Sequence, residues 1–170
     1  MKIIPIFAEK LYAFQYDGEV EDEYFRLLDL WTNNTYLQQY AKANNIAGAR
    51  GFVEKIISNA EYIDDLMIKI SKSNQVLESF FKPLNDLETG IRVLSLQKGR
   101  RYSLRIYAIK IDSNLFVITG GAIKLVHKMS EHVDTRNEKN KLEAAKAYLK
   151  RNGVSDSDSF YDLMTENYED

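Results

Sequence analysis

The chain has 170 residues, of which 45% are hydrophobic and 28% are charged, with two prolines and no cysteine. This composition is typical of a globular protein and excludes disulfides, thiolate metal sites and long disordered or collagen-like segments. The net charge of −2 is unevenly distributed, since residues 1–91 carry −5, residues 92–151 carry +9 and residues 152–170 carry −6. No apolar run approaches the ~20 residues of a membrane span, and the N-terminus is not typical of a signal peptide. We therefore expect a cytoplasmic location and no membrane partner.

The first forty residues predict two short strands followed by two helices. The strands flank residues 8–10, and Asp17-Gly18 is a turn signal. Aromatic and leucine side chains then recur at helical spacing, and Asn33-Asn34 predicts a break between the helices. We interpret Trp31 and the neighbouring tyrosines as core residues, with a ligand pocket as the alternative. The carboxylates of residues 17–23 are interpreted as the solvated start of a helix, with a cation site as the alternative.

The middle of the chain predicts a long helix and an irregular basic loop. Apolar residues follow the 3.6-residue period over about residues 51–73. A shorter helix is expected over residues 75–81, where Pro83 ends it. Residues 87–101 have no regular period, and we expect a basic loop there.

The basic block of the sequence predicts a β-meander. Strands are expected at residues 102–111, 115–119 and 122–128, with turns at 112–114 and at Gly120-Gly121. Alternation places Arg105 and Tyr107 on one face of the first strand, with Leu104, Ile106 and Ala108 on the other. A helix over about 134–151 follows, and the acidic tail, residues 152–170, either forms a capped helix or frays.

Motifs for several site types are absent from the sequence. There is no phosphate-binding loop, no GxGxxG after a strand, no HExxH and no GxSxG, and we expect no cofactor. With two histidines in the chain, a His-rich metal site is excluded, and a site built from His127, His132 and Glu131 remains only as a weak alternative.

Basic side chains on the predicted strands suggest a surface for RNA. Cations gain from phosphate contacts, and tyrosines can stack bases. RNA cleavage at a 2′-hydroxyl needs a base, an acid and cations for the charge that develops on the phosphate, which Arg, Lys and His supply. The candidate catalytic residues are Arg105, Lys124, His127 and Lys128. The candidate nucleic-acid-binding residues are Lys98, Arg100, Arg101, Tyr107 and Lys110.

The alternative is that these basic side chains have no binding role and only keep the strands soluble. Lysines on edge strands discourage aggregation, and strand ends are commonly solvated.

One segment, "FFKPLNDLETGIRVLSLQKGRRYSLRIYAIKIDSNLFVITGGAIKLVHKM", resembles the core of RelE/HigB-like toxins of the RelE/ParE superfamily. The similarity rests on "KPL" at 82–84, "LRIYAI" at 104–109, the Asp-Ser-Asn turn and "GGAIKLVHK", and it extends over about residues 78–151. The resemblance implies a small antiparallel sheet packed by helices and cleavage of messenger RNA, often on the ribosome. It also implies an antitoxin protein encoded nearby.

The resemblance also implies roles for single residues. Arg105 matches the arginine of the central R-x-Y strand, Lys124 the basic residue after the next apolar strand, and His127 and Lys128 further site positions. The chain departs from the family in a helical insertion at about 20–81 and in its acidic balance. The related ParE branch acts on DNA gyrase without cleaving RNA.

We therefore predict a single α+β domain with a twisted antiparallel sheet of about five strands. The helical insertion forms a layer on one face, the sheet core occupies about residues 92–151, and the 134–151 helix lies alongside. The predicted function is metal-independent RNA cleavage by a RelE/HigB-like toxin or toxin relative. The alternatives are a non-catalytic protein of the same fold that binds a protein or nucleic acid, and an unrelated domain of structural role.

Overall fold

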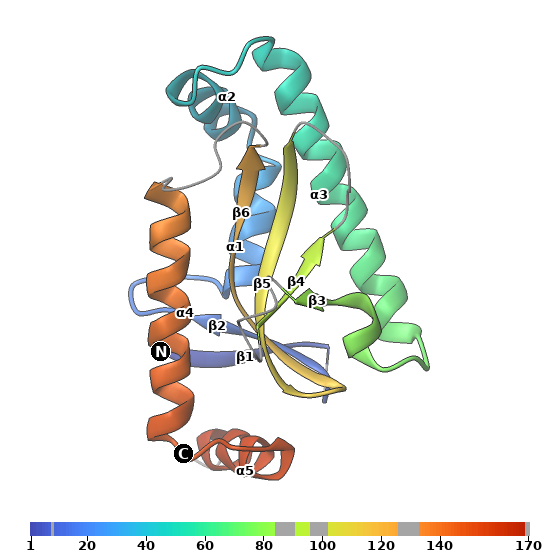
Figure 1. Cartoon of the computed structure of the whole chain (residues 1–170), viewed down its shortest axis with the longest axis vertical. Coiled ribbons are helices and arrows are strands. Elements are labelled where there is room, and N and C mark those ends of the chain that lie inside the picture. The colour runs from blue at the N-terminus through green and yellow to red at the C-terminus, as the bar shows by residue number, and fades with distance from the viewer. Residues whose placement is uncertain (8, 84–90, 96–101, 126–132, 169–170) are drawn as a thin grey trace.

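The computed structural model describes residues 1–7, 9–83, 91–95, 102–125 and 133–168. Helices flank one central sheet (Figure 1). In chain order the elements are β1 (Lys2–Phe7), β2 (Leu11–Gln15), α1 (Glu23–Trp31), α2 (Asn34–Ala43), α3 (Ala49–Lys72), the 3₁₀ helix η1 (Leu77–Phe80), β3 (Lys82–Pro83), β4 (Ile91–Ser95), β5 (Tyr102–Asp112), β6 (Leu115–Leu125), α4 (Val133–Arg151) and α5 (Ser157–Tyr168).

The sheet has the strand order β1-β2-β6-β5-β4-β3. All neighbouring strands are antiparallel except β2 and β6, which run parallel and pair only through Leu11–Ala13 and Phe116–Ile118. The α+β class is confirmed. The predicted antiparallel sheet of about five strands is instead a mixed sheet of six among the described residues.

The glycine pair Gly120-Gly121 is the largest departure from the predicted strand pattern. We expected a turn there, but both glycines lie inside the eleven-residue strand β6, which pairs with β5 along its length. The register shifts at this point, between Tyr107 and Ala108. Close packing explains the glycines better than a turn does, because a Cβ on Gly120 would collide with the Glu138 carboxylate and one on Gly121 would lie 2.5 Å from the Arg105 carbonyl oxygen.

Replacing Gly121 with alanine is expected to lower the free energy of unfolding by roughly 2–4 kcal/mol. The added methyl would also lie 2.9 Å from Leu27 and 3.0 Å from Trp31, and the Arg105 carbonyl cannot move without breaking the β5–β6 ladder. Urea unfolding measures the effect. The matched control is Gly51→Ala in α3, where nothing lies within 4 Å, and it should leave stability unchanged or raise it by up to about 1 kcal/mol. Equal stability of both variants would contradict the packing argument.

The described helices cover both faces of the sheet (Figure 1). One core lies between the sheet and α1, α2 and α3, and includes Trp31, Phe52 and Ile106. A second core lies between the opposite face and α4 and α5, and includes Leu142 and Phe160. The helix at about 134–151 therefore covers the second face, where we had expected it alongside the first helical layer.

Local sequence signals explain most helix boundaries. The Asp22 side chain accepts hydrogen bonds from the first turn of α1, and Asn33 does the same for α2, as the predicted break requires. The short helix after α3 is a single 3₁₀ turn, Leu77–Phe80.

One region differs from its prediction, and a second decides between two alternatives that the sequence left open. Strand β4 lies inside the segment for which we expected only a loop, since Ile91–Ser95 pairs with β5. The acidic tail forms α5, whose Phe160 is fully buried and packs edge-on against Tyr12 with ring centroids 4.9 Å apart. Helix formation is therefore the correct alternative for residues 157–168.

Among the helices described, each falls short of the length or the apolar character that crossing a bilayer would require.

Candidate functional site

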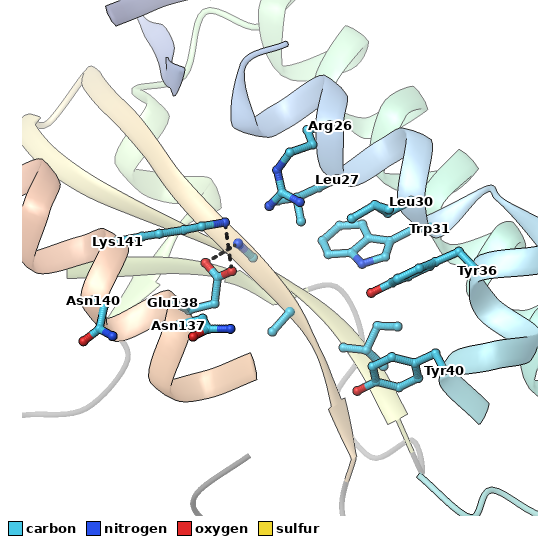
Figure 2. A pocket seen from close by; sticks show the side chains of 13 residues that line it. Arg26, Leu27, Leu30, Trp31, Tyr36, Tyr40, Asn137, Glu138, Asn140 and Lys141 are labelled. Carbon is cyan, nitrogen blue, oxygen red and sulfur yellow. Dashed lines mark hydrogen bonds and ion pairs between the residues drawn. The ribbon is translucent and has the colours of Figure 1, made fainter. Parts of the chain in front are cut away.

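A cavity of about 400 Å³ lies between α1, α2, α4 and the second half of β6. Figure 2 shows Leu30, Trp31 and the two tyrosines Tyr36 and Tyr40 on one wall, and Glu138 and Lys141 of α4 on the other. The cavity opens here because β2 pairs with β6 only as far as Ile118, which leaves the next residues of β6 without a strand on that side in the described chain.

Two side chains occupy the place of the missing strand. The Tyr16 hydroxyl donates to the Thr119 carbonyl oxygen at 2.6 Å, and the Gly121 amide donates to Glu138 Oε2 at 3.0 Å. Backbone groups at such an edge need partners when water is excluded. Glu138 is therefore held in place by the backbone of the sheet as well as by its own helix.

A buried ion-pair network joins α1 to α4. The Glu23 carboxylate, 1% exposed, accepts from Arg26 at 2.7 and 2.8 Å and from Lys141 at 3.2 and 3.3 Å. Lys141 Nζ also lies 3.5 Å from Glu138 and 5.6 Å from the centre of the Tyr16 ring. Two of the five carboxylates at 17–23 have structural roles, since Asp22 caps α1 and Glu23 binds cationic side chains. Both are buried, so the expected solvated helix start is wrong for these two. Among the described residues, no three His, Cys, Asp or Glu side chains are grouped to hold a metal ion.

The pKa of Glu138 is raised to about 7. Burial is the largest cause and the Glu23 charge adds to it, whereas Lys141 and Arg26 act in the opposite direction. Burial, followed by Glu23 and Glu138, likewise raises the pKa of Tyr16, so its hydroxyl remains a hydrogen-bond donor. Glu138 is thus a carboxyl group that gains or loses a proton near neutral pH, at the wall of a cavity.

Three of the predicted site residues share the face of the sheet that α4 covers. Arg105 and Tyr107 alternate with Leu104, Ile106 and Ala108, which are buried in the other core, as predicted. Lys124 pairs with Ser103 and Arg105 with Ala122, so the two cations are diagonal neighbours, with their Cβ atoms somewhat less than roughly 7–8 Å apart. Lys124 reaches this position because β6 continues through its glycines as one strand, not because they form a turn.

The three side chains influence one another electrostatically. Desolvation and then the Arg105 charge lower the pKa of Lys124. Burial raises the pKa of Tyr107 although Arg105, through its charge and a hydrogen bond, lowers it, and Glu138 raises it further. Tyr107 therefore senses both Arg105 and Glu138. Arg105 Nε is buried and has no hydrogen-bond partner in the described part of the chain.

The other predicted site residues do not join this group in the structure. Lys110 lies on the opposite face of β5, where its Nζ is 2.6 Å from Glu78 Oε1 of η1. The remaining predicted residues, Lys98, Arg100, Arg101, His127 and Lys128, lie outside the described residues. Their roles stay predictions.

Sequence reasoning missed the α4 half of the site. Glu138 and Lys141 stand one helical turn before Leu142 and Ala145, on the stripe that packs against the sheet. Charged residues that extend an apolar stripe are a usable signal for a buried polar site. The core interpretation is correct for Trp31, which is 2% exposed, and Trp31 also lines the cavity together with Tyr36 and Tyr40.

Comparison with known proteins identifies no relative, because no family model, curated protein or solved structure matches the chain.

Proposed function

We propose that the protein binds single-stranded RNA on the α4 side of the sheet and cleaves it by metal-independent acid–base chemistry, as a RelE/HigB-like toxin or toxin relative. The observation that carries the proposal is the buried Arg105 Nε, for which the described chain offers no acceptor. A buried donor without a partner costs about 1–3 kcal/mol, and more on a charged group. A phosphodiester oxygen would supply that acceptor, and the planar guanidinium binds phosphate with two parallel hydrogen bonds.

Lys124 strengthens the case for an anion at this position. Desolvation is the main cause of the lowered pKa of Lys124, and the repulsion between Arg105 and Lys124, two cations on one sheet face, adds to it. A phosphate between them would relieve the repulsion and stabilise the negative charge that develops in the transition state.

Glu138 supplies the base that the reaction needs. The 2′-oxygen attacks the neighbouring phosphorus and gives its proton to the Glu138 carboxylate. The bond from phosphorus to the 5′-oxygen breaks, and that oxygen takes a proton from an acid. We assign this acid to His127 and stabilisation of the transition state to Lys128, both of which the sequence predicts as catalytic residues. The products are a 2′,3′-cyclic phosphate and a 5′-hydroxyl.

A substrate without the nucleophile tests the proposal directly. The purified chain should cleave a single-stranded RNA in the presence of a chelator and should leave intact the same strand carrying one 2′-deoxy residue at the cleavage position. Mass spectrometry of the products should find the cyclic phosphate. Cleavage of the deoxy substrate, or products with a 5′-phosphate, would contradict the mechanism.

The same proposal includes a partner. A ribonuclease of this kind would arrest growth when expressed alone, and a small protein encoded nearby would act as its antitoxin.

A further inference from the structure

We infer that the cavity between α1, α2 and α4 receives one unpaired base of the RNA. This inference rests on the proposed function and names the part of the substrate that the cavity binds. The phosphate subsite at Arg105 and Lys124 is separate from it.

The wall formed by α1 and α2 is a stacking platform. The Tyr36 and Tyr40 side chains point toward the cavity in Figure 2. Tyr40 lies parallel to Phe52, with ring centroids 6.0 Å apart and planes within 8°, and Phe52 is buried in the core. The ring centroids of Tyr36 and Tyr40 are 6.2 Å apart. An aromatic surface fixed in this way needs no reordering before a base stacks on it.

The opposite wall offers polar groups that could bind the edge of a base. Asn137 of α4 lines the cavity with Glu138, and its amide has both a donor and an acceptor. Paired bases hide their hydrogen-bonding edges inside a helix, whereas unpaired bases present them to side chains. The volume of about 400 Å³ is at the small end of ligand cavities and suits a single nucleotide.

Charge favours the base over the phosphate in this cavity. Among the described residues of the lining, the cations are Arg26 and Lys141; both are ion-paired to Glu23, and Glu138 lies close to Lys141. Two carboxylates thus balance two cations, and a phosphate would gain little there. The uncharged ring of a base is the better fit, while Arg105 and Lys124 offer net positive charge for the phosphate.

The chain reports on this cavity through its single tryptophan, Trp31, which lines it. We expect a 2′-O-methyl trinucleotide, which cannot be cleaved, to change Trp31 fluorescence in a saturable way. The same trinucleotide with an abasic central residue should bind more weakly by about 5–150-fold, the range of one base–aromatic stacking contact. Tyr40→Leu should weaken binding of the intact trinucleotide by a similar factor and leave binding of the abasic one unchanged.

The matched control is Tyr62→Leu, because Tyr62 is a half-exposed tyrosine of α3 that does not line the cavity. It should bind both trinucleotides like the parent. Equal affinity of the parent for both trinucleotides would overturn the inference, as would a Trp31 response to a phenylalanine-containing peptide that carries no tryptophan but not to the intact trinucleotide. Because nothing is cleaved in this measurement, a failure of the base pocket is distinguishable from a failure of the proposed cleavage.

Discussion

Arg105→Ala is expected to slow RNA cleavage by about 10²–10³-fold, the usual effect of removing one preorganised donor from a developing negative charge. Arg105 Nε is buried without a partner in the described chain, and Lys124 is its diagonal neighbour on the same face. The alanine variant loses the planar donor but leaves the backbone ladder intact. Single-turnover cleavage of a short RNA gives the rate directly.

Stability separates this role from a structural one. Loss of the hydrogen bond to Tyr107 and relief of the partnerless Nε should nearly offset each other, so Arg105→Ala is expected to change the free energy of unfolding by less than about 1 kcal/mol, whereas removing a fully paired structural arginine would lower it by more. Lys110→Ala on the same strand is the matched control, because Lys110 lies on the other face and is paired with Glu78. We expect that variant to cleave RNA at the parental rate. An Arg105→Ala protein that cleaves like the parent, or one that is slow only because it unfolds, would contradict the assignment.

The elements of the fold were largely predictable because their signals are local. Helix caps at Asp22 and Asn33, the alternation along β5 and the turn at 112–114 each depend on a few neighbouring residues. The conformation of Gly120-Gly121 depends on tertiary packing, since atoms of other elements leave no room for a side chain at either position. In the sequence, a glycine pair between two apolar runs looks the same whether it forms a turn or lies in a strand where neighbouring atoms leave no space for a side chain.

The candidate site was predictable only in the half that lies on one hairpin. Arg105, Tyr107 and Lys124 follow from strand alternation, although Lys124 was placed there through a turn that does not exist. Glu23 and Glu138 are 115 positions apart and meet only because Lys141 bridges them across the packed helices. The residue periodicity of neither segment predicts that contact between α1 and α4. The parallel pairing of β2 with β6 was equally hidden, and it is what leaves the β6 edge open to Glu138 and Tyr16.

Glu138→Gln is expected to slow cleavage by about 10²–10⁴-fold, since a positioned acid–base group contributes that much. Glutamine keeps the size of the side chain and an oxygen that can accept from the Gly121 amide. It cannot take the proton of the 2′-hydroxyl. In the parent the base must be ionised, so with a pKa of about 7 for Glu138 the rate should rise about tenfold per pH unit below pH 7 and level off above it. The variant should lose this dependence.

The pH dependence of the free energy of unfolding should report the same protonation of Glu138. The ordinary pKa of this carboxyl is 4.5 and its folded value is about 7, so the folded chain binds the proton more tightly than the unfolded chain does. The free energy of unfolding of the parent should therefore fall as the pH rises from about 4.5 to about 7, by about 3 kcal/mol in total. Glutamine carries no such proton, so the variant should equal the parent near pH 4.5 and exceed its stability by up to about 3 kcal/mol at pH 8.5.

Glu143→Gln provides the control, because Glu143 is an exposed glutamate of the same helix, 63% accessible, with Lys146 at 3.7 Å. It should change neither the rate nor the pH dependence of stability. A Glu138→Gln protein that is less stable than the parent at pH 8.5 would mean that the charge of Glu138 holds α4 against the sheet. One that is more stable but retains the parental rate profile would place the base elsewhere. If Glu138 is the base, the variant should lose the pH dependence of the rate and should also be more stable than the parent above pH 7. Both results together would show that ionised Glu138 destabilises the fold and that the reaction needs it as a base.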